Sequence, residues 1–338
     1  MVYNKDMGKW LVFIVILAGI SFLTATFLIQ PKFVEVEHKQ LADVKPEQIE
    51  KDQIKIILAG DIMLNRGIEY MVEKYGGGDF KFPFLKIAEE FQKADIVFGN
   101  LEGPISDKGV KVGSIYSFRN DPQVIEGLKF AGFNVISLAN NHAFDYGRQA
   151  LEDTFLRLKE ADINYVGAGF NEFEAYSPVI KEVKSVKIAF LAYTNLGPET
   201  WQAQGQNSGI TWLNEKLFDK AGQQIEDAKE NSDILIVSLH AGEEYQTEPT
   251  QFQIDFAKMA IDAGADLVVG HHPHIIQLTG TEENNWIFYS LGNFIFDQSF
   301  SEETMKGKII ELLIEKNKIN EINQREVKIN EFYQPEIK

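Results

Sequence analysis

The chain contains no cysteine, and this absence excludes disulfide bonds and every metal site built on thiolate ligands. Histidine is also scarce, with six residues among 338. A metal centre in this protein would therefore combine a few imidazoles with carboxylate or amide oxygens. Such ligands suit divalent ions such as Mn, Fe, Zn or Mg.

Basic residues are too few to balance the acidic ones: 33 lysines and arginines accompany 50 aspartates and glutamates, which leaves a net charge of −17. No stripe of basic residues interleaved with aromatic ones occurs, so we expect no binding to nucleic acid. The main body also lacks a polar low-complexity tract. With 44% hydrophobic residues, the chain is able to bury one large core or two modest ones.

One long hydrophobic run without charge is present, at residues 10–29. A helix of this length spans about 30 Å, the thickness of the hydrocarbon core of a bilayer. Lys5 and Lys9 precede the run and acidic residues follow it, so the positive-inside rule places the C-terminal part outside the cytoplasm. The sequence predicts a single-pass plasma-membrane protein with residues 1–9 in the cytoplasm. A cleaved signal peptide is the alternative, but the run is longer than an ordinary signal core and no clear small-residue cleavage site ends it.

The rest of the chain divides into a stalk, a domain and a tail. Residues 30–52 are polar, contain two prolines and show no sustained periodicity, which predicts an extracytoplasmic stalk. From Ile54 onward, short apolar runs alternate with amphipathic stretches of helical length. Strands with nearly continuous apolar faces are typical of a sheet covered on both sides. We predict one α/β domain over residues 53–325, without internal repeats, and a polar tail over 326–338.

Residues that can bind a metal follow five of the predicted strands, at the edge of the sheet where ligands bind in open α/β folds. They are Asp61, Glu102, Asn141 with His142, His240, and the group His271, His272 and His274. Each alone has a simpler interpretation: a turn or cap residue (Asp61, Asn141), a solvated carboxylate (Glu102) or a hydrogen-bonded structural imidazole (His240). Their repetition after five strands favours a shared site.

The segment His272-Pro273-His274 places two imidazoles where a strand ends. On an extended backbone, residues i and i+2 face the same side, so both rings are expected to point into one cleft. Proline stiffens the segment where the sheet stops. Two imidazoles with one or two carboxylates would make a half-site for each of two nearby cations. Such ions lower the pKa of bound water and stabilise an oxyanion.

Seven motifs occur in the order found in a known family, over roughly residues 54–297: GDIM, GNLEGPIS, FRNDP, ISLANNHAFDYG, SLHAGEEY, GHHPH and YSLGNFIFD. In these motifs the chain resembles the CapA family of bacterial capsule-synthesis proteins, implicated in poly-γ-glutamate production. The domain of that family is similar to the calcineurin-like metallophosphoesterases. The resemblance implies a four-layer α/β/β/α sandwich with one or two divalent ions at the strand ends, behind a single transmembrane helix.

The resemblance also implies a role for each candidate residue. Asp61 and His274 would bind the first metal, and Glu102 would bridge both. The second metal would be bound by Asn141, His240 and His272. His142 would be the general acid. In the superfamily a carboxylate usually follows this histidine directly, whereas here Ala143 follows it and Asp145 is the nearest substitute.

Two of these assignments have alternatives, and one position departs from the pattern. Asp145 could instead be the N-cap of a helix beginning at Arg148, and His271 is either a neighbour of the ligands or an exposed bystander. Met63 stands where the superfamily has a histidine, so the first metal is expected to lose a protein contact. Arg119 is a candidate for binding a substrate carboxylate or phosphate, unless it is a surface arginine.

Three functions are compatible with these residues. The first is a membrane-tethered, metal-dependent hydrolase or transferase acting on an anionic capsule polymer or on a phosphoryl- or lipid-linked precursor. The second is a non-catalytic factor that binds the polymer in the same cleft and helps its export or assembly. The third is a scaffold whose cleft is idle. His142 favours the first and Met63 the second; membrane-bound polymer synthase components are the expected partners.

Overall fold

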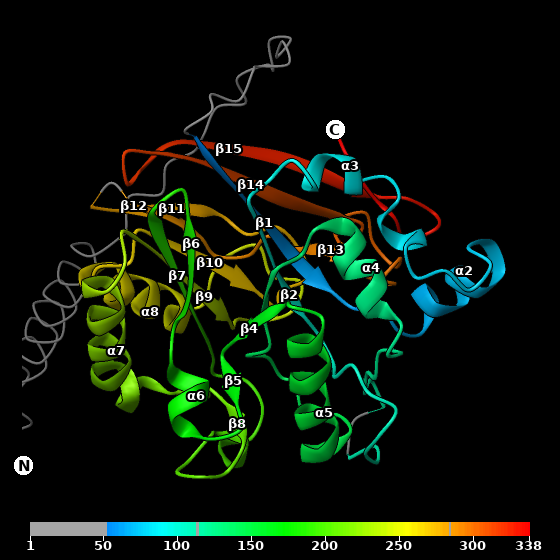
Figure 1. Ribbon diagram of the computed structural model, residues 1–338, viewed down its shortest axis with the longest axis horizontal. Coiled ribbons are helices and arrows are strands. Elements are labelled where there is room, and N and C mark those ends of the chain that lie inside the picture. Colours follow the sequence, from blue (N-terminus) through cyan, green and yellow to red (C-terminus); the bar gives the residue numbers. More distant parts are fainter. Residues whose placement is uncertain (1–52, 113–114, 284) are drawn as a thin grey trace, which may run out of the picture. The chain divides into compact units, whose positions relative to one another are not determined.

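Two β-sheets pack face to face at the centre of the protein, and helices cover both outer faces (Figure 1). The computed structural model describes residues 53–338 except 113–114 and 284, and the statements below concern those residues. The order helices, sheet, sheet, helices confirms the four layers and the α/β class expected from the sequence.

The first sheet has eight strands, with β1 near its middle. The order is β16-β15-β14-β1-β2-β3-β4, and β13 pairs with β1 off this path. β1 runs parallel to β2 and β13 and antiparallel to β14. The strands are β1 (Ile54–Ile62), β2 (Ile96–Leu101), β3 (Val135–Ser137), β4 (Asn164–Val166), β13 (Asn293–Ile295), β14 (Lys306–Glu315), β15 (Lys318–Ile329) and β16 (Pro335–Ile337).

The second sheet has six strands in the order β11-β12-β10-β9-β7-β6. Its four central strands are parallel, and an antiparallel pairing closes each edge. The strands are β6 (Val179–Val183), β7 (Val186–Thr194), β9 (Ile234–His240), β10 (Leu267–His271), β11 (Thr279–Glu282) and β12 (Asn285–Phe288). A separate pair consists of β5 (Ala168–Gly169) and β8 (Gly209–Ile210).

Helices lie outside the sheets and connect the parallel strands. The α-helices are α2 (Gly67–Tyr75), α3 (Ala88–Phe91), α4 (Val124–Ala131), α5 (Gly147–Glu160), α6 (Glu172–Tyr176), α7 (Phe218–Glu230) and α8 (Gln251–Asp262). Short 3₁₀ helices occur at η1 (Phe82–Phe84), η2 (Glu199–Trp201) and η3 (Glu215–Leu217). Buried residues of α2, α4 and α5 pack on the first sheet, and those of α7 and α8 pack on the second.

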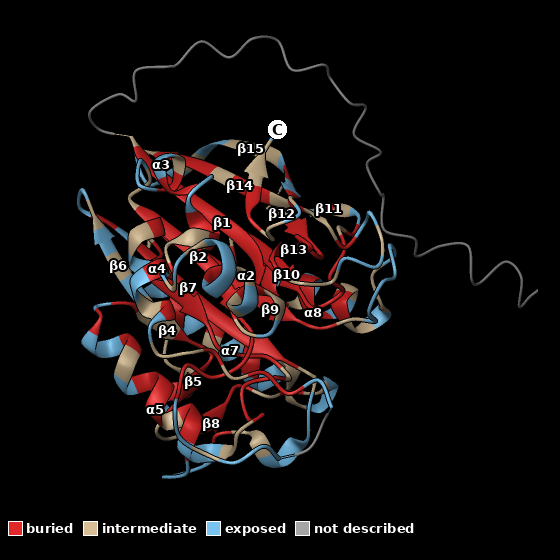
Figure 2. Cartoon of the chain, turned by 90° about the vertical axis from the view of Figure 1, so that its right-hand side faces the viewer, coloured by how far each residue is buried: buried red, intermediate tan, exposed pale blue. Residues whose placement is uncertain are grey.

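Alternation along each strand divides the apolar residues between three cores. In β1, Ile54, Ile56 and Leu58 face the second sheet, whereas Ile57 packs under the helices. Between the sheets, Phe98 stacks on a phenylalanine of β7, Phe190, with ring centroids 5.5 Å apart. Figure 2 shows the result: the central strands are buried along their length, and exposed residues lie at the edges.

The predicted polar tail at residues 326–338 is wrong. β15 continues to Ile329, and β16 pairs with it in antiparallel register. Val327 and Ile329 are buried, whereas Lys328 between them is exposed. This alternation of one apolar and one charged residue is polar on average, yet it suits a strand with one face on the core.

The N-terminal predictions fall on residues that the structure does not describe. They are the cytoplasmic residues 1–9, the membrane-spanning run 10–29 and the stalk 30–52. Within the described part of the chain, no helix combines the length and apolar character needed to cross a membrane.

Candidate metal centre

The parallel strands of both sheets end at a common site, where their polar residues meet. In the first sheet Asp61 of β1 is in register with Asn100 of β2. In the second, His240 at the end of β9 is in register with His271 at the end of β10. The side-chain amide of Asn100 joins the two sheets: its Nδ2 donates to Asp61 Oδ1 at 2.8 Å and lies 3.1 Å from His240 Nδ1.

An inner group of ligands is fully buried. Atoms of Asp61, Glu102 and His240 that could bind a metal lie within 4.8 Å of one another. Neither carboxylate oxygen of Glu102 has a hydrogen-bond partner among the described residues. The closest imidazole nitrogens are Nε2 of His142, at 3.7 Å, and Nε2 of His240, at 4.0 Å. A buried carboxylate without a partner is costly, so this arrangement fits a bound cation.

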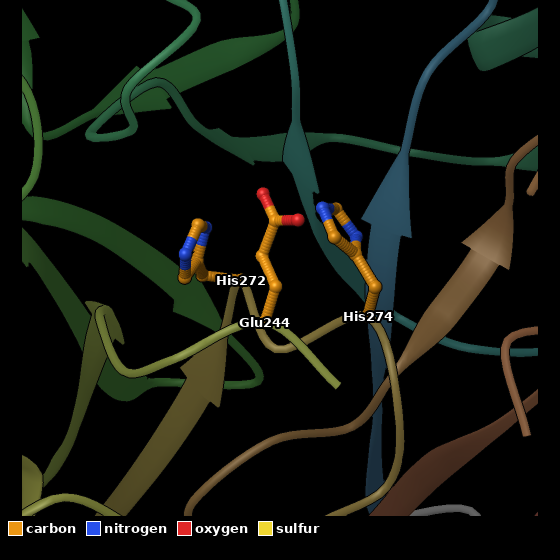
Figure 3. A group of neighbouring side chains, drawn as sticks. All are labelled: Glu244, His272 and His274. Carbon is orange, nitrogen blue, oxygen red and sulfur yellow. The ribbon is translucent and has the colours of Figure 1, made fainter. Parts of the chain in front are cut away.

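An outer group lies beside the inner one and consists of Glu244, His272 and His274. Their ligand atoms are also within 4.8 Å of one another; both histidines are buried and Glu244 is exposed. Figure 3 shows the carboxylate of Glu244 between the two imidazole rings. We did not predict Glu244 from the sequence, although it lies in the motif SLHAGEEY, four residues after His240.

The charge states of these groups suit metal ligands. Burial, followed by the neighbouring His274, lowers the pKa of His272 to about 3. Burial also lowers the pKa of His240 well below its usual value. At neutral pH these imidazoles are uncharged, the form in which a histidine binds a cation. Burial opposes ionisation of Asp61, but hydrogen bonding and charge from His271 and the other imidazoles outweigh it and lower the pKa of this carboxyl group.

Glu102 behaves in the opposite way. Burial, and then the negative charge of Asp61, raises the pKa of Glu102 well above its usual value. A divalent cation nearby would reverse this balance, because it supplies the positive charge that the buried carboxylate lacks.

Asparagines around the ligands set the tautomers of the histidines. Asn293 Nδ2 donates to the backbone oxygen of Thr304, so its Oδ1 has to accept from His274 Nδ1, at 2.9 Å. His274 Nε2 consequently carries the lone pair and is free to bind a metal.

Asn141 Oδ1 lies 2.8 Å from His240 Nε2, close to the roughly 3 Å that separates two ligands of one octahedral ion. Asn100 and Asn293 were missed as site residues, although both lie in motifs quoted from the sequence.

His142 and Asp145 form a hydrogen-bonded pair at the edge of the inner group. His142 Nδ1 donates to Asp145 Oδ2 at 2.7 Å, and the same oxygen accepts from Phe118 N at 2.7 Å. The His142 ring lies on the Phe118 ring, with centroids 4.0 Å apart. Helix α5 has Tyr146 as its N-cap without a side-chain hydrogen bond, so the alternative role of Asp145 as N-cap is wrong. Asp145 holds the ring of His142 instead.

The extended backbone expected for the His272-Pro273-His274 segment is wrong. β10 ends at His271, and His272 and His274 have φ values of 100° and 59°. The two rings are nevertheless close, with centroids 5.8 Å apart, because the chain turns sharply there. The backbone N–H of His272 donates to Asp61 Oδ2 at 3.1 Å, which anchors the turn to the first sheet.

His271 is not an exposed bystander. It is fully buried, and its Nδ1 lies 3.4 Å from Asp61 Oδ1, so it is a neighbour of the ligands. Met63 is fully buried as well, and its sulfur accepts a hydrogen bond from Asn65 N at 3.2 Å.

Among the described residues, none of the contacts of Arg119 involves a candidate metal ligand. Its guanidinium stacks over Tyr146 at 4.3 Å and donates to the backbone oxygen of Lys108. The guanidinium nearer to the centre belongs to Arg66, which sequence reasoning missed. Arg66 lies over the Phe118 ring at 4.6 Å, is paired with Asp297, and its charge acts to lower the pKa of Glu102.

A cavity in the described part of the chain lies away from these residues. It measures about 1010 Å³, is lined by β14, β15 and the segments beside them, and includes none of the candidate metal ligands. Four lysines and three glutamates line it, so its charge does not select an anion.

The arrangement of sheets and helices and the candidate metal centre together define a mixed α/β protein. Two adjoining groups of candidate metal ligands lie where its parallel strands end. Residues 55–298 match the family model described as bacterial capsule synthesis protein PGA_cap, and the chain belongs to this family. The CapA resemblance stated from the motifs is thereby confirmed.

Two relatives of known sequence agree with this assignment. The chain is 34% identical to the capsule biosynthesis protein CapA of Bacillus anthracis, over 82% of this chain and 68% of that protein. It is 32% identical to the PGA biosynthesis protein CapA of Bacillus subtilis, over 79% and 69%. A crystal structure of a hypothetical protein from Thermus thermophilus has a TM-score of 0.51 and 16% identity, covering 81% of this chain and 98% of that one. This last likeness concerns the fold alone.

Proposed function

We propose that this protein is a membrane-anchored, metal-dependent hydrolase or transferase of capsule synthesis, with a centre of the metallophosphoesterase type. Its substrate would be poly-γ-glutamate, another anionic capsule polymer, or a phosphoryl- or lipid-linked precursor. The names of two relatives, a capsule biosynthesis protein and a PGA biosynthesis protein, support the polymer class. The observation that carries the catalytic part is the His142–Asp145 pair beside the unpartnered carboxylate of Glu102.

The ligand sets described above would hold one or two divalent ions. When bound, such ions lower the pKa of a water molecule and stabilise an oxyanion. His142 would act from the edge of this centre. Asp145 accepts from Nδ1 of the ring, and the opposite nitrogen, Nε2, faces Glu102. In the imidazolium form of the ring, Nε2–H would give its proton to a leaving oxygen and leave a neutral imidazole.

The surroundings of His142 limit its movement. Phe118 stacks on one face of the ring, and Arg66 lies over Phe118. The guanidinium of Arg66, rather than that of Arg119, is therefore placed to attract an anionic substrate toward the centre.

The location of the protein is part of this proposal. Residues 10–29 would anchor the chain in the plasma membrane, with the domain outside the cytoplasm, beside membrane-bound polymer synthase components. The uncharged run at residues 10–29 and the lysines before it support this orientation.

A second candidate function is a non-catalytic factor that binds the polymer through the same metal centre. Met63 favours it, because the buried thioether removes one imidazole from the first metal site of the superfamily pattern.

His142→Ala separates the two functions. If the protein is an enzyme, the variant keeps its metal content, loses roughly 10²–10⁴-fold in turnover of a generic phosphoester with added Mn²⁺, and lowers capsule yield in cells. His38→Ala, a change outside the domain, is the control and should alter neither. Unchanged capsule yield with His142→Ala would refute the catalytic function. Loss of yield with His272→Ala, without turnover in any assay, would support the binding function.

A further inference from the structure

The loop after β9 carries two adjacent acidic residues, Glu243 and Glu244, and both are exposed. Only Glu244 brings a carboxylate oxygen within 4.8 Å of the imidazoles of His272 and His274 (Figure 3). Its negative charge also raises the pKa of Glu102 and opposes the effect of burial on the pKa of His274. Glu244 therefore acts electrostatically on both groups of ligands.

The backbone beside Glu244 is tied to the segment that carries the two histidines. Tyr245 N donates to the backbone oxygen of Pro273 at 2.9 Å, and Leu278 N donates to that of Thr247. Gln277 Nε2 donates to the backbone oxygens of residues 246 and 248, at 2.9 and 3.0 Å. These bonds fix the loop over the His272-Pro273-His274 turn, so the position of Glu244 follows from the fold and not from a mobile side chain alone.

The two imidazoles of this group are available for a cation, whereas Met63 offers no good ligand. The sulfur of Met63 accepts from a backbone N–H within the core, and a thioether is a poor ligand for hard divalent ions. His274 Nε2 carries a lone pair, as its Nδ1 is held by Asn293, and His272 Nδ1 is buried without a hydrogen-bond partner among the described residues. Two imidazoles and one carboxylate are a ligand set that divalent ions accept.

We propose that Glu244 is a metal ligand, which completes an outer site with His272 and His274. This inference rests on the proposed metal centre and adds a ligand that the superfamily pattern does not contain. The outer site has one exposed ligand, whereas the inner site of Asp61, Glu102 and His240 is buried throughout. An ion held at the outer site would therefore be open to exchange with solvent, and a substrate would reach it first.

The test compares wild-type full-length chain with Glu244→Gln and with Glu243→Gln, which removes the same charge one residue away. Each protein is stripped with a chelator and titrated with Mn²⁺ in a calorimeter, and its ion content is measured after dialysis. We expect two ions in the wild type and in Glu243→Gln. In Glu244→Gln one ion binds at least ~10-fold more weakly, and the other is unchanged.

The outcomes distinguish this inference from the function on which it rests. If the wild type binds two ions and Glu244→Gln binds both with the same affinity, Glu244 is not a ligand, and the metal centre itself stands. If the wild type binds none, the centre and the inference fail together. Because Glu244 is exposed, its substitution should leave the thermal midpoint of the metal-free protein unchanged, so a folding defect does not mimic ligand loss.

Discussion

The side-chain amide of Asn100 lies 3.1 Å from Nδ1 of His240, and this contact connects the two sheets at the candidate metal centre. Asn100 belongs to β2 of the first sheet and His240 to β9 of the second. The orientation of the amide is determined by its other bonds, since its Oδ1 accepts from Asn140 and its Nδ2 also donates to Asp61. The two halves of the site are thus held together even without an ion.

Asn100→Ala should destabilise the protein without changing its surface, because Asn100 is buried. The change removes a buried donor from the carboxylate of Asp61 and from His240, and a hydrogen bond to a charged group contributes about 1.5–3 kcal/mol. We expect the free energy of unfolding, measured by urea denaturation, to fall by about that amount. Asn207→Ala, at an exposed position, is the matched control, and equal stabilities for the two variants would contradict the connecting role.

Replacing Glu102 should change the pH dependence of stability on the alkaline side. Its pKa is raised in the folded protein, so the folded state retains a proton that the unfolded chain releases, and stability falls as the pH rises above about 4.5. In the metal-free protein, Glu102→Gln removes this loss. As the pH rises from 5 to 8, the wild type should therefore lose more unfolding free energy, or gain less, than the variant. If unfolding free energy changes with pH in the same way in both proteins, the buried carboxylate of Glu102 does not destabilise the fold when it is charged.

The stability of the folded protein at acidic pH depends on the buried imidazoles. The pKa of His272 is lowered to about 3, so its contribution to stability is complete above pH ~6.5 and is lost as the pH falls toward 3. His272→Gln in the metal-free chain should reduce the slope of unfolding free energy against pH in this window by up to ~1.4 kcal/mol per pH unit. His38→Gln, outside the domain, should leave the slope as it is. If the slope of unfolding free energy against pH is the same in His272→Gln as in the wild type, the imidazole of His272 is not held in its uncharged form by burial.

Asp145→Asn tests whether the aspartate positions His142. The variant loses the carboxylate that accepts from Nδ1, so the ring is held less firmly. For an active enzyme we expect turnover to fall by roughly 10–10²-fold, with the metal content unchanged. Asp153→Asn, a buried aspartate of α5 that pairs with Lys108, serves as control for a general loss of stability. Unchanged turnover with Asp145→Asn would show that this aspartate does not position His142.

Many residues that meet at the candidate site could be predicted from the sequence, because the signals are local. Apolar runs of strand length identify the strands, and the first polar residue after each run lies where the strand ends, as Asp61, His240 and His271 do. His142 and Asp145 are three residues apart, so their pairing also depends on a short segment. The alternation in β15 was present too, but its charged residues made it resemble a polar tail.

Contacts between segments far apart in the chain could be identified only in the tertiary structure. Glu244, Asn100 and Arg66 reach the centre only through packing of one sheet on the other and through folding of loops. Glu244 and Asn100 lie in motifs quoted from the sequence, but the motifs do not show that their side chains reach the ligands. The turn at His272 likewise depends on its bond to Asp61 in the opposite sheet. Strand identity and ligand chemistry follow from the order of residues, because side-chain period and atom type are local properties. The distances that make a metal centre follow from close packing of two surfaces, which the whole domain determines.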